Sequence, residues 1–132
     1  MELNFLRADP AGNITVFVLD PVEKAQRAAI AEKIMAIPAL KAAQVGYACA
    51  AEDDVDGHME MRGGEFCGNA TRAYGMYIAQ QKGGLSSVRL RVSGCDHAVT
   101  AQVDLKSGTA RAAMPCPRSV KRVTVNGHEG TL

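Results

Sequence analysis

Residues 63–75 read GGEFCGNATRAYG and place one cysteine, Cys67, between a glycine-rich turn and a segment with helical spacing. This spacing predicts a helix over about residues 68–82. Its small or apolar positions are Ala70, Ala73, Tyr74, Gly75, Met76, Tyr77, Ile78 and Ala79. Because a helix that is apolar most of the way round belongs inside a domain, the stretch predicts a buried helix against which the rest of the chain packs.

Strand patterns fill most of the remaining chain. The segments that alternate or run apolar are LNFLRA, ITVFVL, residues 44–50, HMEM, SVRLRV, HAVTAQVDL, TARAAM and VKRVTV. Residues 21–36 show helical spacing instead, with Asp20 as the predicted N-cap, Pro21 at the first helical position and Glu23 in a capping-box position. These patterns predict an α+β fold with a mostly antiparallel sheet, one outer helix and one buried helix.

Length and charge narrow the function classes. The chain has 132 residues, enough for a single domain over residues 1–132. Fifteen basic residues against 14 acidic ones give a net charge of +1, which argues against a nucleic-acid partner and against binding to an anionic membrane. No apolar run approaches the roughly 20 residues of a membrane span. The first residues lack a signal-peptide pattern, which favours a cytoplasmic location.

The end of the chain suggests an interrupted strand pair. Asn126 and Gly127 form a strong hairpin-turn signal after VKRVTV, and only HEGTL follows. A returning strand therefore begins near the last residue. We expect this chain to be the N-terminal part of a longer protein whose C-terminal domain is absent from it.

The spacing of the cysteines and histidines predicts no metal site. Cys49, Cys67, Cys95 and Cys116 are widely and irregularly separated, without a CxxC pair. The run from Cys95 to His97 is interpreted as a hairpin corner, and Cys49 and Cys116 as core or loop thiols. The acidic loop over residues 52–57, together with His58 and His128, is interpreted as solvated.

The position of Cys67 allows two interpretations. The first turn of a helix carries free N–H groups and the positive end of the helix dipole, an environment that favours a thiolate. The N–H groups of Gly68, Asn69 and Ala70 would also bind a carboxylate. A base beside an anion site is what proton abstraction next to a carboxylate requires. The alternative is a structural cysteine in a glycine turn, and the residues alone leave both open.

A resemblance to a known family bears on this choice. GGEFCGNAT resembles the Cys-Gly-Asn motif of the diaminopimelate epimerase family of pyridoxal-independent amino-acid racemases and epimerases. In matching order, the chain also has segments similar to other parts of that family: PAGNITVFVLD, QVGY, LRVSG and ARAAMPCP. Within the family, the motifs PAGN, QVGY, EFCGNAT and VSGC are most similar to the histidine racemases of staphylopine-type metallophore pathways.

The resemblance implies a fold and a mechanism. The fold would have two similar domains, each a sheet curled around a central helix, with the active site between them. The mechanism would use two bases and no cofactor: Cys67 would exchange the α-proton on one face of the substrate. Gly68 and Asn69 match residues that hold the substrate carboxylate, and Asn13 matches a residue that contacts substrate. The second base would come from the missing domain or a second chain, including a homodimer.

Two departures from the diaminopimelate epimerases concern the substrate. Residues 61–64 read MRGG where those enzymes have a run like Asn-Ala-Asp-Gly, and the Gln that follows their Val-Gly segment is missing, with Cys49 near that position. Both argue against diaminopimelate and favour another amino acid, with histidine the best candidate. Cys49 and Arg62 are candidate pocket residues. The alternatives are a racemase or epimerase of another amino acid, diaminopimelate epimerase included, and a non-catalytic module that binds a small molecule.

Overall fold

A seven-stranded mixed sheet forms the body of the domain. The computed structural model describes residues 3–9, 12–112, 122–125 and 128–131. Strands lie side by side in chain order, and the elements are β1 (Phe5–Ala8), β2 (Thr15–Val18), α1 (Lys24–Met35), β3 (Gln44–Cys49), β4 (Gly57–Met61), α2 (Gly68–Gln81), β5 (Ser87–Val92), β6 (Val99–Asp104) and β7 (Thr109–Ala112). The predicted α+β class is confirmed.

The sheet is mostly antiparallel, as predicted, but it also contains two parallel pairs. The pairs β2–β3 and β4–β5 are parallel, while the other neighbouring pairs are antiparallel. The reason is that α1 connects β2 to β3 and α2 connects β4 to β5. A helix that crosses over between neighbouring strands returns the chain to the same end of the sheet, which makes those strands parallel.

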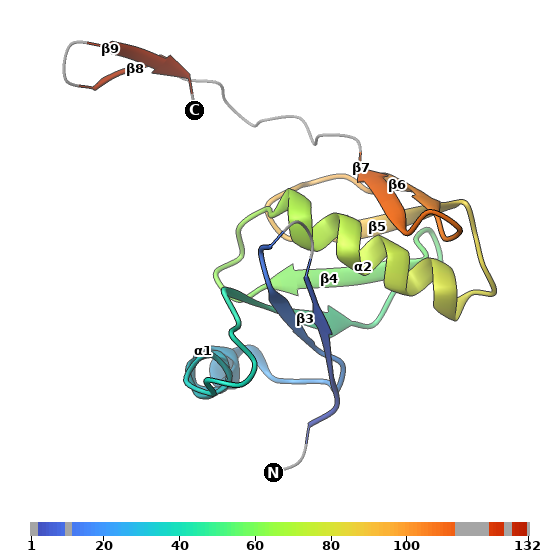
Figure 1. Ribbon diagram of the computed structural model, residues 1–132, viewed down its shortest axis with the longest axis horizontal. Helices are drawn as coiled ribbons and strands as arrows, with labels where there is room; N and C mark the ends of the chain where they lie inside the picture. Colours follow the sequence, from blue (N-terminus) through green and yellow to red (C-terminus); the bar gives the residue numbers. More distant parts are fainter. Residues whose placement is uncertain (1–2, 10–11, 113–121, 126–127, 132) are drawn as a thin grey trace.

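The two helices pack on opposite faces of the sheet. The antiparallel pair β3–β4 reverses the strand direction between the two crossovers. Since such crossovers are right-handed, the reversal requires the helices to lie on opposite faces. Figure 1 shows α2 lying along β4, with α1 apart from it beside β3. The two core clusters agree, because Ile30 and Ala31 of α1 pack with Tyr47, whereas Tyr74 of α2 packs with Phe17.

The larger core lies between α2 and the sheet. Tyr74 stacks in a tilted arrangement on Phe17, with ring centroids 5.3 Å apart. Burial raises the pKa of Tyr74 to about 12, so this residue packs as a neutral ring at neutral pH. Gly75 permits close packing, since an added Cβ would lie 2.9 Å from the Ala101 Cβ of β6. Small residues on α2 therefore let the strands of the curled sheet approach this helix closely.

The helix boundaries follow the predicted spacing, but one cap does not. The helix predicted over about 68–82 is observed as Gly68–Gln81. The helix predicted over 21–36 begins later, at Lys24, with Glu23 as an N-cap that makes no side-chain capping bond. Asp20 was predicted to cap it and does not, because its carboxylate accepts from the backbone N–H of Asn4 at 2.6 Å. Asp20 therefore stabilises the backbone just before β1 rather than the start of α1.

The last described elements are β8 (Arg122–Val125) and β9 (His128–Thr131), an antiparallel pair that forms a sheet of its own. The returning strand predicted from HEGTL is therefore present. The turn residues Asn126 and Gly127 lie outside the described residues, as does Cys116. Among the helices in the described ranges, none has the length and apolar character needed to cross a membrane.

Candidate active site

Cys67 is the N-cap residue of α2, as the sequence predicted. Its Sγ accepts from the backbone N–H of Ala70 at 3.5 Å, and its carbonyl accepts from both the N–H and the hydroxyl of Thr71. The side chain is half-buried. A thiol is a weak acceptor compared with the oxygen of Ser, Thr or Asp, which most helices use as a cap. The sequence therefore places sulfur where an oxygen would cap the helix better.

A glutamine from β3 contacts this thiol. Gln44 Oε1 lies 3.1 Å from Cys67 Sγ. The same oxygen lies 3.4 Å from Asn13 Nδ2 and 3.4 Å from Thr15 Oγ1. The structure thus joins three of the motifs that carried the family resemblance, because Asn13 belongs to PAGN, Gln44 to QVGY and Cys67 to EFCGNAT.

The orientation of the Gln44 amide fits the protonated state of the cysteine. With Oε1 directed at sulfur, the thiol S–H donates and the carbonyl accepts. A thiolate has no proton to donate, and the carbonyl dipole would then point its negative end at a negative sulfur. Rotation of the amide would present its NH₂ group instead, but it would also give up the contact of Oε1 with the Asn13 amide. The observed orientation of Gln44 therefore fits the neutral thiol.

The fourth motif, VSGC, holds the loop that precedes Cys67. The Ser93 hydroxyl donates to the carbonyl of Glu65 at 2.7 Å and accepts from the N–H of Met61 at 2.8 Å. Gly94 has φ +79°, and an added Cβ there would lie 2.3 Å from the Phe66 nitrogen. The strand after α2 thus fixes the backbone immediately before the cysteine.

The first turn of α2 carries the predicted carboxylate-binding residues. Gly68 and Asn69 are half-buried at the start of the helix, beside Cys67. The side-chain oxygen of Asn69 accepts from the guanidinium of Arg72. The N–H of Ala70 is directed at the Cys67 sulfur, 3.5 Å away. The positive end of the helix dipole faces the same place.

Arg62 lies in a pocket with Gln44, the residue that contacts the Cys67 thiol. A pocket of about 280 Å³ is lined by Arg62 and Gln44 together with Met35, Ala43, Val45, Gly63 and Glu65. Arg62 is exposed, and its Nη1 lies 3.1 Å from the sulfur of Met35. This residue therefore lines a pocket that reaches Gln44.

Cys49 is not brought to Cys67. It lies at the other end of β3 from Gln44, about 17 Å away at the usual rise per strand residue. Alternation along the strand also directs Cys49 to the face opposite Gln44. There it lies near Arg27 of α1, whose Nη2 is 3.7 Å from its sulfur.

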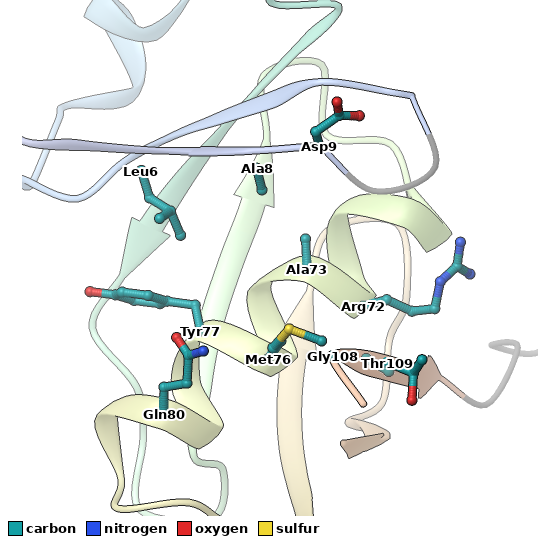
Figure 2. Close-up of a pocket in the computed structure, with 11 residues that line it drawn as sticks. Leu6, Ala8, Asp9, Arg72, Ala73, Met76, Tyr77, Gln80, Gly108 and Thr109 are labelled. Atoms are coloured by element: carbon teal, nitrogen blue, oxygen red, sulfur yellow. The ribbon is translucent and has the colours of Figure 1, made fainter. Parts of the chain in front are cut away.

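A larger cavity, of about 490 Å³, lies elsewhere along α2. Figure 2 shows Leu6 and Ala8 of β1 pointing toward the helix, with Thr109 of β7 on the other side. Arg72, Ala73, Met76, Tyr77 and Gln80 supply the helix side of this groove. Its lining does not include Cys67. The cavity marks where the two ends of the curled sheet approach α2.

Three residues of the site were not predicted from sequence as site residues: Gln44, Thr15 and Ser93. The signal for Gln44 was a polar residue opening an otherwise apolar strand, on the face shared with Gly46 and Ala48. The family's Gln after the Val-Gly pair is missing from this chain. Gln44, which directly precedes the pair, contacts Cys67 instead.

The comparisons with known proteins agree on one family. The family model described as the histidine racemase CntK N-terminal domain matches residues 2–132. A histidine racemase of Fusobacterium nucleatum subsp. nucleatum is 40% identical over 79 residues, which are 58% of this chain and 27% of that protein. A histidine racemase of Staphylococcus aureus (strain Mu50) is 34% identical over 101 residues, 74% of this chain and 37% of that protein. The chain thus spans about a third of the length of these relatives.

Proposed function

The chain belongs to the family of histidine racemase CntK N-terminal domains, and from this we propose that it is the proton-transferring N-terminal part of a cofactor-independent histidine racemase. The observation that carries the proposal is the contact of Cys67, at the start of α2, with Gln44. The contact holds the thiol at the N-terminus of the helix, where the helix dipole would stabilise a thiolate.

The proposed chemistry is a transfer of protons between two faces of one carbon. The Cys67 thiolate takes the α-proton of the amino acid: the C–H bond breaks, an S–H bond forms and the electron pair stays on the α-carbon. A second acid then donates a proton to the opposite face, which yields the mirror-image amino acid. In the reverse direction Cys67 is the donor, and Gln44 accepts the hydrogen bond of its thiol.

The substrate carboxylate would bind at the start of α2. The N–H groups of Gly68 and Asn69 and the helix dipole supply a site for a negative group. We propose that Asn13 contacts the bound amino acid, since its side chain already reaches Gln44. Placing the carboxylate here would set the α-carbon beside Cys67, and hydrogen bonds to the developing charge would stabilise the carbanion.

The second acid is proposed to lie outside this chain's half-barrel. The relatives are about three times as long as the segment they share with this chain, which supports a further domain. In that arrangement α2 is the central helix of the N-terminal domain, α1 its outer helix, and the active site forms where the C-terminal domain meets Cys67. A homodimer that presents two copies of Cys67 is the alternative. We place the reaction in metallophore biosynthesis in the cytoplasm.

Other substrates remain as alternatives. Arg62, Gln44 and Glu65 line the pocket beside the thiol's partner, and this polar set would suit a polar side chain. Another amino acid, diaminopimelate included, is the second candidate substrate. A non-catalytic module would keep the carboxylate site and bind an amino acid without exchanging its α-proton.

Proton exchange in deuterated water tests the proposal. The protein extended with its C-terminal domain is incubated with L-histidine, other L-amino acids or diaminopimelate, and deuterium at the α-carbon and the product enantiomer are measured. We expect both with histidine. Exchange with another amino acid alone would replace the substrate, and binding without exchange would indicate the module. The 132-residue chain alone should not turn over; turnover by its dimer would indicate two Cys67 thiols in one site.

A further inference from the structure

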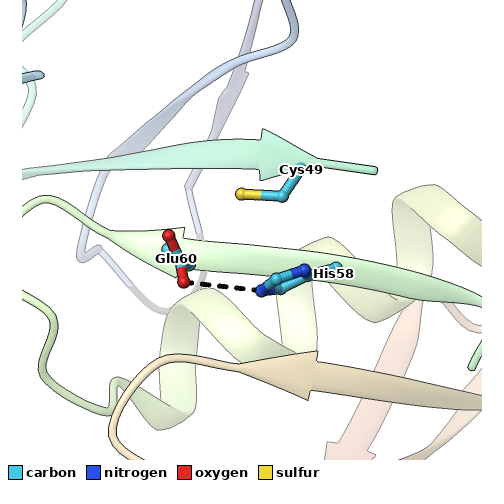
Figure 3. Close-up of side chains that lie close together, drawn as sticks. All are labelled: Cys49, His58 and Glu60. Atoms are coloured by element: carbon cyan, nitrogen blue, oxygen red, sulfur yellow. Dashed lines mark ion pairs between the residues drawn. The ribbon is translucent and has the colours of Figure 1, made fainter. Parts of the chain in front are cut away.

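Three metal-binding side chains gather on the face of the sheet opposite the candidate active site. Cys49 of β3 and His58 of β4 are register partners, and Glu60 follows His58 by two residues and so shares its face. One ligand atom from each of the three lies within 4.8 Å of the others. Figure 3 shows the three side chains together over the two strands. The sequence placed His58 in a solvated loop, because pairing across a sheet leaves no spacing pattern.

We propose that Cys49, His58 and Glu60 form a binding site for a divalent transition metal of the zinc class. Thiolate, imidazole and carboxylate are the three protein ligands that Zn²⁺ takes, in sets of three or four. The side chains of His58 and Glu60 are only 23% and 26% exposed, so the ligands are partly ordered before an ion arrives. With three protein ligands, the fourth position is left to water or an added ligand.

The two oxygens of the Glu60 carboxylate contact different residues, so that one of them could bind an ion. Glu60 Oε1 pairs with Arg27 Nη1 at 2.5 Å, and Oε2 lies 3.5 Å from His58 Nε2. An ion between Oε2, His58 and Cys49 would leave the pair with Arg27 in place. It would replace the weaker contact of 3.7 Å between Arg27 and the Cys49 sulfur.

Arg27 is the charge that opposes binding. Its guanidinium lies over the Tyr47 ring, 5.1 Å from the centroid, and is held there by Glu60. A cation entering the cluster meets this positive group. Metal binding also requires Cys49 to give up its proton, which burial first and the Glu60 charge second oppose by raising its pKa, whereas Arg27 lowers that pKa. We therefore expect Arg27→Gln to strengthen metal binding at alkaline pH, where Cys49 no longer depends on Arg27 to lose its proton.

The proposed ion would join β3 to β4 and would not act at Cys67. Cys49 closes β3 at the end away from Gln44 and on the other face. A metal here would stabilise the folded chain by binding only the native state. This consequence is independent of the racemase proposal and can be measured without any substrate.

The test is a metal titration of the metal-free 132-residue chain. Co²⁺ is added first, and the charge-transfer absorption of a thiolate bound to cobalt is recorded; Zn²⁺ then displaces it. Thermal unfolding is followed with and without Zn²⁺. We expect one ion per chain, a higher midpoint of unfolding with zinc, and binding weakened at least about tenfold by Cys49→Ser and by His58→Ala.

The chain offers a matched control cluster. Cys95, Asp96 and His97 also lie within ligand distance of one another, but the side chains of His97 and Asp96 are 50% and 73% exposed. Cys95→Ser, His97→Ala and Cys67→Ser should leave binding within about twofold of the wild type. No binding, or binding lost in these variants instead, would overturn the proposal.

A measurement on the wild-type chain covers the case in which Cys49→Ser unfolds. Zinc should protect Cys49 from alkylation while Cys95 continues to react, as read by mass spectrometry of the peptides. Protection of Cys95 in place of Cys49 would contradict the assignment.

Discussion

Cys67 and Cys49 are both half-buried free thiols near the same strand, yet β3 separates two different environments. At the start of the strand, Gln44 contacts Cys67 with a neutral amide at the N-terminus of a helix. At the end, Cys49 lies among charged groups, with Arg27 and Glu60 nearby. Burial and the Glu60 charge raise the pKa of Cys49. Since both thiols are half-buried, their different neighbours are what separates the proposed proton-transfer role of Cys67 from the proposed metal-binding role of Cys49.

The largest expected effect is on the reaction itself. In a protein extended with the proposed C-terminal domain, Cys67→Ser should lower the proposed histidine racemisation by about 10³-fold, because a hydroxyl is a far poorer base and acid–base groups contribute roughly 10²–10⁴-fold. Chiral chromatography of the product measures this. Cys95→Ser is the control and should retain activity within about twofold. Wild-type turnover by the Cys67→Ser variant would show that Cys67 does not transfer the α-proton.

The backbone that positions Cys67 should be the next most sensitive part. Gly94→Ala should lower the free energy of unfolding by about 3 kcal/mol, because φ is +79° and the new Cβ would overlap the Phe66 nitrogen. Gly108→Ala is matched, since its φ is +71° with nothing within 4 Å, and should cost only about 1 kcal/mol. Urea unfolding measures both. Equal costs would mean that the Gly94–Phe66 contact is unimportant.

Substitution of Gln44 tests the thiol's partner. Gln44→Leu should lower kcat/KM by about 10- to 100-fold, equal to about 1.4–2.7 kcal/mol, since it leaves Cys67 without the amide. Gln44→Glu should also slow alkylation of Cys67, because a carboxylate opposes the thiolate. Gln102→Leu on the exposed side of β6 is the control. Alkylation of Cys67 at the wild-type rate in Gln44→Glu would show that residue 44 does not influence the reactivity of this thiol.

The smallest effect concerns the ion pair near Cys49. Arg27, through its hydrogen bond, lowers the pKa of Glu60 in the folded chain. Its stabilisation is therefore complete above the ordinary glutamate range of about 4.3 and is lost as the pH falls through the lowered value. Glu60→Gln in chelator should cost about 1 kcal/mol at pH 7, and this cost should shrink as the pH falls below the ordinary glutamate range.

The pair between Arg91 and Asp54 is the matched comparison for this measurement. It is longer, at 3.2 Å, and the Asp54 side chain is 55% exposed. Asp54→Asn should therefore cost less than about 0.5 kcal/mol. Equal costs for the two variants would mean that the pair between Arg27 and Glu60 stabilises the fold no more than the exposed pair does.

Local patterns predicted the elements of this fold better than their arrangement. The helix after Cys67 and the strands could be placed because periodicity is encoded within a few neighbouring residues. The parallel pairs were missed, since strand direction depends on which strands a helix connects. The position of Asp20 just before α1 predicts a helix cap. Its carboxylate instead accepts a hydrogen bond from Asn4, which is 16 residues away in the sequence.

The candidate site divides in the same way. The position of Cys67 at the start of α2 could be predicted because the glycine turn and the helix adjoin it in sequence. Gln44 could not, because it meets the thiol across 23 positions and only the curled sheet brings them together. His58 was misjudged for the same reason: its partner Cys49 lies on another strand.

The groove between β1 and β7 has a consequence for handling the purified chain. Within the seven-stranded sheet, β1 and β7 are the edge strands, so each presents a row of backbone N–H and C=O groups at an open edge. Such edges attract other strands, and Leu6 and Ala8 add apolar side chains beside one of them. At high concentration the 132-residue chain should therefore associate through its edges, and its apparent stability should be measured over a dilution series.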